Sequence, residues 1–73
     1  MSHYFRIVRN LHSGGSIGIG ITENGKPFYC EDIKNCVTFH DKASAKRYLR
    51  FCEKTLTKYE GQKDLEVIEI KTP

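Results

Sequence analysis

The chain has 73 residues, hydrophobic residues at 38% of positions and a formal net charge of +3. This length suits one domain, 1–73, and a domain of this size buries about 60% of the surface that its unfolded chain exposes. Little room is left for an enclosed ligand pocket, which typically has a volume of roughly 300–1,000 Å³. We therefore expect a binding protein without catalysis or cofactor rather than an enzyme. No apolar run approaches the ~20 residues of a membrane span, and Arg6 and Arg9 interrupt the apolar stretch nearest the N-terminus, so we expect a cytoplasmic protein.

Three strands are predicted in the first half of the chain. Residues 3–9 are rich in β-branched and aromatic side chains, and residues 16–22 alternate isoleucine with glycine or threonine. The Asn24-Gly25 dipeptide predicts a type I′ hairpin turn, in which both central residues have positive φ. A third strand is predicted at residues 27–30, because a proline is tolerated as the first residue of a strand.

Glycine is concentrated in residues 14–20. A phosphate-binding loop is excluded by context, because such a loop follows a strand and opens a helix, and the P-loop ends in Gly-Lys-Ser/Thr, whereas these glycines run into a strand. Gly18 and Gly20 fall on one face of that strand and weaken it. They indicate either that another segment packs closely on this face or that the strand bends.

The main helical pattern begins after Asp41, a good N-cap residue. The helix is predicted to run from about Lys42 to about Tyr59, with Gly61 as its stop. A final strand at residues 65–70 completes the order β-β-β-α-β. The predicted fold class is α+β, a small antiparallel sheet of three to four strands packed against one long amphipathic helix. The core face of this helix is one apolar stripe: Ala45, Tyr48, Leu49, Cys52, Leu56 and Tyr59.

Basic residues recur at every fourth position of this predicted helix. Residues four apart stack on one helix face, where like charges repel by roughly 0.2–0.5 kcal/mol per pair. Residues 41–58 carry six basic groups against two acidic ones, a balance of +4, and residues 59–73 have a balance of −2. A surface that accepts this repulsion is expected to meet negative charge on a partner.

Phe51 lies among these charges, where an aromatic ring stacks on a base or anchors a protein interface. The alternative is a solvated helix face whose long side chains cover nearby apolar surface, with Phe51 partly covered by a loop. The candidate partner-binding residues are Lys42, Lys46, Arg47, Arg50, Phe51, Lys54 and Lys58.

The three cysteines are an odd count, which suits a reducing compartment. With one histidine they suggest a zinc set, Cys30, Cys36, His40 and Cys52, but no two of its cysteines are separated by the two to four residues usual between paired cysteine ligands. Cys52 lies on the predicted core stripe, where a free cysteine behaves as a small hydrophobe. A Cys–His nucleophile pair lacks a third, orienting residue. We therefore expect no metal ligand and no catalytic residue.

Three segments of the chain, residues 28–39, 41–45 and 65–70, carry a resemblance to a known group of proteins. They comprise a strand, a turn over residues 33–36 capped by Asp32, a capped helix with alanine at its fourth position and a closing strand. From residue 28 onward this pattern resembles small accessory proteins common in bacteriophages and prophages. Cys36 stands where such proteins often have alanine, which indicates a packing role for it.

The resemblance implies a small phage-type accessory protein, which would act in the host-cell cytoplasm. Some proteins of this kind block host defence, including anti-CRISPR proteins that bind a Cas nuclease, and no functional residue is carried over from the pattern. The expected partner is therefore a host defence protein or ribonucleoprotein, which the chain binds and inhibits without catalysis. The basic helix argues against mimicry of DNA and favours an acidic protein surface.

A nucleic-acid-binding module that uses the same basic helix face is the alternative function. It has no aromatic-rich strand motif of a specific RNA-reading fold. The oligomeric state is open, because edge strands at residues 3–9 or 65–70 allow pairing between two chains.

Overall fold

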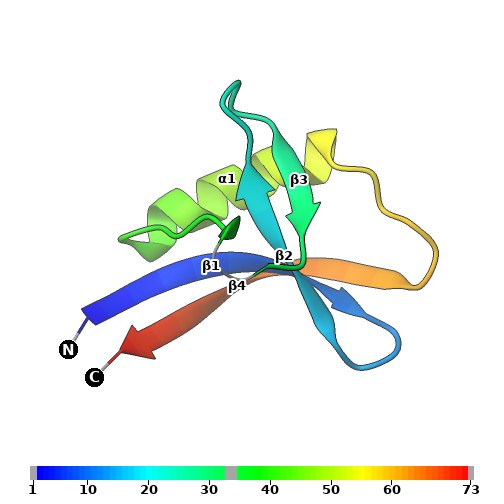
Figure 1. The fold of residues 1–73 in the computed structure, drawn as a ribbon, viewed down its shortest axis with the longest axis horizontal. Helices are drawn as coiled ribbons and strands as arrows, with labels where there is room; N and C mark the ends of the chain where they lie inside the picture. Colours follow the sequence, from blue (N-terminus) through cyan, green and yellow to red (C-terminus); the bar gives the residue numbers. More distant parts are fainter. Residues whose placement is uncertain (1, 33–34, 73) are drawn as a thin grey trace.

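A computed structural model describes residues 2–32 and 35–72, which form a four-stranded antiparallel sheet and one helix (Figure 1). The order along the chain confirms the predicted β-β-β-α-β arrangement and the α+β class. The turn predicted over residues 33–36 lies partly outside the described residues. The elements are β1 (Ser2–Leu11), β2 (Ser16–Ile21), β3 (Pro27–Cys30), α1 (Lys42–Thr55) and β4 (Gln62–Thr72).

The first strand lies in the interior of the sheet. The strand order is β3-β2-β1-β4, with antiparallel pairing throughout. β4 pairs with almost the whole of β1, so the two ends of the described chain meet at Ser2↔Thr72 (Figure 1). The prediction that residues 3–9 offer a free edge is wrong, because β2 and β4 pair with β1 on its two sides. Residues 65–70, within β4, do lie at an edge.

The chain between β3 and α1 fills an opening in the sheet. The ladder between β1 and β2 ends at Gly18, and beyond it β2 diverges from β1 (Figure 1). In the opening, the backbone N–H of Val37 donates to the Ile19 carbonyl at 2.9 Å, and Phe39 and Phe5 exchange two hydrogen bonds of 2.8 Å. Phe39 thereby reaches the side of the sheet covered by α1, where it packs against the core.

The two glycines of β2 allow this segment to pack on the face of the sheet opposite α1. A Cβ atom added at Gly18 would lie 2.2 Å from Cys36 Sγ. One added at Gly20 would lie 2.6 Å from the Phe28 ring and 3.0 Å from the Asn35 carbonyl oxygen. The predicted close packing is therefore confirmed.

The predicted hairpin between β2 and β3 is confirmed, but its predicted turn type is wrong. A type I′ turn needs positive φ at both Asn24 and Gly25. Gly25 has a φ of 81°, but Asn24 does not have a positive φ, because only glycines have one among the described residues. The backbone N–H of Thr22 donates to the Lys26 carbonyl at 2.8 Å, and that of Gly25 to the Thr22 carbonyl at 2.9 Å. This is the three-residue loop in which a type I turn is followed by a left-handed glycine.

The core lies between the sheet and α1. Ile7 of β1, Ile19 of β2 and Cys52 of α1 are fully buried. The predicted core stripe of the helix is confirmed for five residues: Ala45, Tyr48, Leu49, Cys52 and Leu56 are buried or half-buried. The half-buried side chains packed against the fully buried ones are Tyr29, Phe39, Tyr48, Leu49, Leu56, Leu65 and Val67.

α1 ends at Thr55, earlier than predicted. Leu56 has an extended backbone, with φ −94° and ψ 122°, while its N–H still donates to the Cys52 carbonyl at 2.7 Å. The Tyr29 hydroxyl then donates to the Thr57 carbonyl at 2.5 Å. The helix ends at the extended Leu56, and the Tyr29 hydroxyl ties the segment that follows to a strand on the far side of the core.

This early end corrects three predictions. Tyr59 lies outside α1, is 59% exposed and contacts the Tyr29 ring at a centroid distance of 6.0 Å, so its assignment to the core stripe is wrong. Lys58 also lies outside α1 and is not part of the helical row of basic residues. Gly61, with φ 87°, belongs to the turn before β4 rather than to a helix stop.

The predicted N-cap is confirmed, and it gives α1 a pH-dependent anchor. The backbone N–H of Ser44 donates to Asp41 Oδ1 at 2.7 Å, and the Ser44 hydroxyl donates to Oδ2 at 3.1 Å. These two hydrogen bonds hold the pKa of the Asp41 carboxyl below its ordinary value.

Asp41→Asn is therefore expected to remove an acid-sensitive part of the stability. A carboxylate with a lowered folded pKa stabilises the fold above its unfolded pKa of about 3.9, and this contribution is lost as the pH falls through the folded value. Asparagine caps the helix without a charge. The difference between the urea midpoints of wild type and variant should be largest near neutral pH and shrink below about pH 4. A constant difference down to about pH 2 would contradict this role.

Candidate functional site

The basic residues of α1 lie outside the stripe of the helix that packs on the sheet. Ala45 and Cys52 turn to the core and are fully buried, whereas every basic side chain of α1 is exposed. In the described part of the chain, Glu69 pairs with Lys71 and lies within hydrogen-bond distance of His3, at 3.2 Å, and no ion pair involves α1. We call these α1 residues the basic face: Lys42, Lys46, Arg47, Arg50 and Lys54.

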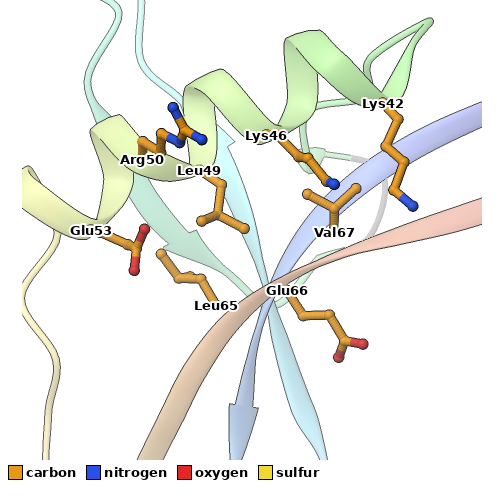
Figure 2. A pocket seen from close by; sticks show the side chains of 8 residues that line it. All are labelled: Lys42, Lys46, Leu49, Arg50, Glu53, Leu65, Glu66 and Val67. Carbon is orange, nitrogen blue, oxygen red and sulfur yellow. The ribbon is translucent and has the colours of Figure 1, made fainter.

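Part of the basic face borders a groove of about 410 Å³ between α1 and β4, which we call the β4 groove (Figure 2). Its apolar lining consists of Leu49 from α1 and of Leu65 and Val67 from β4, all half-buried. Figure 2 shows Lys42 and Lys46 extending from α1 towards Val67. The groove therefore combines an apolar lining with a positively charged rim. The basic residues on this rim are Lys42, Lys46 and Arg50.

Two acidic residues also border the β4 groove, without cancelling its charge. Glu53 projects from α1 beside Leu65, at one end of the groove (Figure 2). Glu66 points away from α1, and its Oε2 accepts a hydrogen bond of 2.9 Å from Asn10 Nδ2 (Figure 2). The positive potential is therefore expected to be strongest between Lys42 and Lys46.

Phe51 lies apart from the β4 groove. It is 42% exposed on the flank of α1 that faces the β2–β3 hairpin. Its ring contacts Tyr48 at a centroid distance of 5.6 Å, and the Tyr48 hydroxyl donates to the Gly25 carbonyl at 3.1 Å. A second groove, of about 320 Å³, is lined by Lys26, Pro27, Phe51 and Thr55. Arg47 and Lys54 line neither the β4 groove nor this second groove.

The sequence did not indicate that β4 contributes to this surface. The alternation of Leu65 and Val67 with acidic residues predicts a half-buried strand, but it does not say which helix flank lies above that strand. That neighbour is decided by the sheet order, which places β4 outermost beside β1 and beneath α1.

The candidate zinc set is divided by the sheet. Cys52 is buried on the α1 side, whereas Cys30 and Cys36 lie on the opposite face. There the Cys30 thiol donates to the Asp32 carbonyl at 3.1 Å, and the Cys36 thiol donates to the Cys30 carbonyl at 3.7 Å. Over residues 2–32 and 35–72, no three His, Cys, Asp or Glu side chains lie together as a metal site.

The three thiols are expected to differ in reactivity. Burial raises the pKa of Cys52 to about 11, and burial together with a hydrogen bond to Cys30 raises the pKa of Cys36. Only the thiolate is alkylated, so native Cys52 should resist iodoacetamide near neutral pH, while the half-buried Cys36 reacts first and faster as the pH rises. Peptide mass spectrometry measures this order, and unfolded protein, in which all three react, is the control. Early labelling of native Cys52 would contradict its burial.

The chemistry offered by the basic face is the binding of negative charge, with the β4 groove adding apolar contact. No helix in the described part of the chain is long and apolar enough to cross a membrane. Known proteins do not assign the chain to a family: no protein-family model, no curated protein and no solved structure matches it.

Proposed function

We propose that this chain is a small phage-type accessory protein that binds and inhibits a host defence protein, such as a Cas nuclease, without catalysis. The observation that supports the proposal is the basic face of α1, whose exposed charges have no ion-pair partners among the described residues and which borders a groove with an apolar lining. An acidic protein surface supplies the complementary charge, and a side chain anchored in the β4 groove supplies apolar burial. The resemblance carried by residues 28–39, 41–45 and 65–70 supports a phage origin.

A charge-reversal variant with a matched control tests this docking surface. Lys46→Glu/Arg50→Glu/Lys54→Glu is expected to weaken partner binding about 100-fold, because like charges facing each other across an interface cost several kcal/mol. The control, Lys26→Glu/Lys58→Glu/Lys63→Glu, makes the same change in net charge outside α1 and outside the lining of the β4 groove. The partner is captured on tagged wild-type protein from nuclease-treated host lysate and identified by mass spectrometry. Its affinity for each variant is then measured by calorimetry.

The identified partner must also be inhibited. Expression of the wild type in a host that carries the captured defence system should restore phage plating, and the α1 variant should not restore it. Equal binding by both variants would contradict docking through the basic face. Recovery of nucleic acid without a protein partner would contradict the proposed class of target.

The exposure of Phe51 favours nucleic-acid binding as a second candidate function. The ring lies on α1 close to Lys54 in sequence and is 42% exposed, which is suitable for stacking on a base. Four phosphate contacts would lower the affinity for double-stranded DNA by about two orders of magnitude between about 50 mM and 200 mM salt. Fluorescence anisotropy with labelled single- and double-stranded probes measures this slope. No binding at low salt would eliminate this candidate.

A further inference from the structure

β4 has a free backbone edge directly beside the β4 groove. Phe5 of β1 exchanges both of its backbone hydrogen bonds with Phe39, on the side away from β4. Phe5 and Glu69 are therefore a non-hydrogen-bonded pair of the antiparallel ladder between β1 and β4. Ile7 and Val67, two residues further along, are also such a pair, because hydrogen-bonded and non-hydrogen-bonded pairs alternate along the ladder. Glu69 and Val67 consequently turn their N–H and C=O groups away from β1. In the described chain β4 has no other strand neighbour, so these groups face solvent.

The basic face matches the spacing of side chains on a strand added at this edge. Lys42, Lys46 and Arg50 rise about 6 Å apart along α1. Alternate side chains of a β-strand, which point to the same face, are about 6.8 Å apart. A strand paired with β4 would place every second side chain on the α1 side of the sheet, where Val67 also points. Acidic residues at those alternate positions would meet successive cations.

The charge of the groove argues against a second copy of the chain as the occupant. Antiparallel pairing of two β4 edges would bring the Lys42, Lys46 and Arg50 side of one helix towards the same side of the other, where like charges repel. The opposite edge of the sheet is less suited to strand addition. β3 has only four residues and begins with Pro27, which lacks an N–H group.

We infer that the partner adds an extended segment, acidic at alternate positions, as a fifth strand along the free edge of β4. This inference rests on the proposed function, because it names the part of an acidic partner protein that the basic face recognises. Main-chain hydrogen bonds to Val67 and Glu69 contribute affinity, as in other cases of strand addition, and the cations select the acidic sequence.

A synthetic peptide of alternating glutamate and threonine is the probe. Binding is followed by amide NMR of isotope-labelled protein at low salt, and the exchange of the Val67 and Glu69 amides with solvent is expected to slow when the peptide is bound. Two control peptides separate charge from strand pairing. Alternating lysine and threonine tests the sign of the charge, and alternating glutamate and proline keeps the acids but removes half of the N–H donors.

Two substitutions at one position test the backbone contact in the protein. Val67→Pro removes an N–H that faces solvent, a change that an edge strand tolerates, and Val67→Ala shortens the same side chain but keeps the N–H. Val67→Pro is expected to bind the glutamate–threonine peptide about tenfold more weakly than Val67→Ala, as for the loss of one hydrogen bond. Slowed exchange of the wild-type amides provides the same evidence independently of how the proline variant folds.

The outcomes separate this inference from the proposed function. Equal binding by Val67→Pro and Val67→Ala, with binding lost in Lys46→Glu/Arg50→Glu, overturns strand addition and leaves docking on the basic face in place. Binding of the peptide by none of the proteins, or equally by all of them, overturns the inference, whereas the proposed function is contradicted only if the captured partner binds the α1 variant and its control equally. Protection of the Val67 amide that rises with protein concentration alone assigns the edge to a second copy and overturns the inference.

Discussion

Gly18→Ala is expected to lower the free energy of unfolding by about 3 kcal/mol, at the upper end of the cost of overpacking. The added Cβ would lie 2.2 Å from Cys36 Sγ and 3.2 Å from the Cys30 carbonyl oxygen. That carbonyl belongs to the strand paired with Gly18 and has little freedom to move. A chain of this length is expected to unfold with about 4–11 kcal/mol, so this loss is a large share of the total. Urea denaturation followed by circular dichroism measures it.

Two companion variants separate this contact from the general effect of replacing a glycine. Gly15→Ala introduces a Cβ with no atom within 4 Å and should change the stability by less than about 0.5 kcal/mol. Gly18→Ala/Cys36→Ala removes the sulfur that the new methyl group meets, and it should recover the part of the loss that comes from this contact, while the contact with the Cys30 carbonyl oxygen remains. Equal destabilisation by Gly15→Ala, or no recovery in the double variant, would show that close packing at Gly18 is not the cause.

Tyr29→Phe is expected to cost about 2–3 kcal/mol, because it leaves the Nε of the buried Arg9 guanidinium without its partner and releases the Thr57 carbonyl. Arg9 is only 4% exposed; its Nε donates to the Tyr29 hydroxyl at 3.2 Å and its Nη1 to the Lys63 carbonyl at 2.8 Å. The same hydroxyl donates to the Thr57 carbonyl at 2.5 Å. Phenylalanine keeps the ring beneath the guanidinium, so the loss isolates the hydroxyl.

Tyr59→Phe is the matched control for this second variant. Tyr59 is 59% exposed, and its ring contacts Tyr29 at 6.0 Å between centroids. Removal of its hydroxyl should change the urea midpoint little. Limited proteolysis supplies a second measurement, since the segment after α1 should be cut faster in Tyr29→Phe. A Tyr29→Phe variant as stable as Tyr59→Phe would show that the hydroxyl does not hold this segment.

Local patterns predicted most of the elements of this fold. The alternation in residues 16–22, the Asp41 cap and the apolar stripe of α1 each depend on neighbours within a few residues, and each agrees with the structure. The errors occur where a distant residue takes part. The segment after α1 is held by Tyr29, a residue of β3, whereas the predicted end at Tyr59 rested on helical periodicity and on Gly61 as a stop signal.

The candidate site was predicted in part. The spacing of Lys42, Lys46 and Arg50 placed these cations on one flank of a helix, and the structure places them together on the rim of the β4 groove. The same spacing included Lys58, which lies beyond the helix, and Phe51, which borders a different groove. Helical periodicity describes the position of a side chain around one helix, but not the element that packs beside each flank.

By itself, the sequence determined the fold class, the helix start and the concentration of positive charge on one element, because periodicity, capping and charge are properties of adjacent residues. Only the tertiary structure decided that β1 is central, that β4 is a free edge and that this edge lies beneath the basic face. The physical reason is that antiparallel pairing satisfies the backbone equally well in several strand orders. The choice among these orders depends on long-range packing around Ile7, Ile19 and Cys52, which no local pattern encodes.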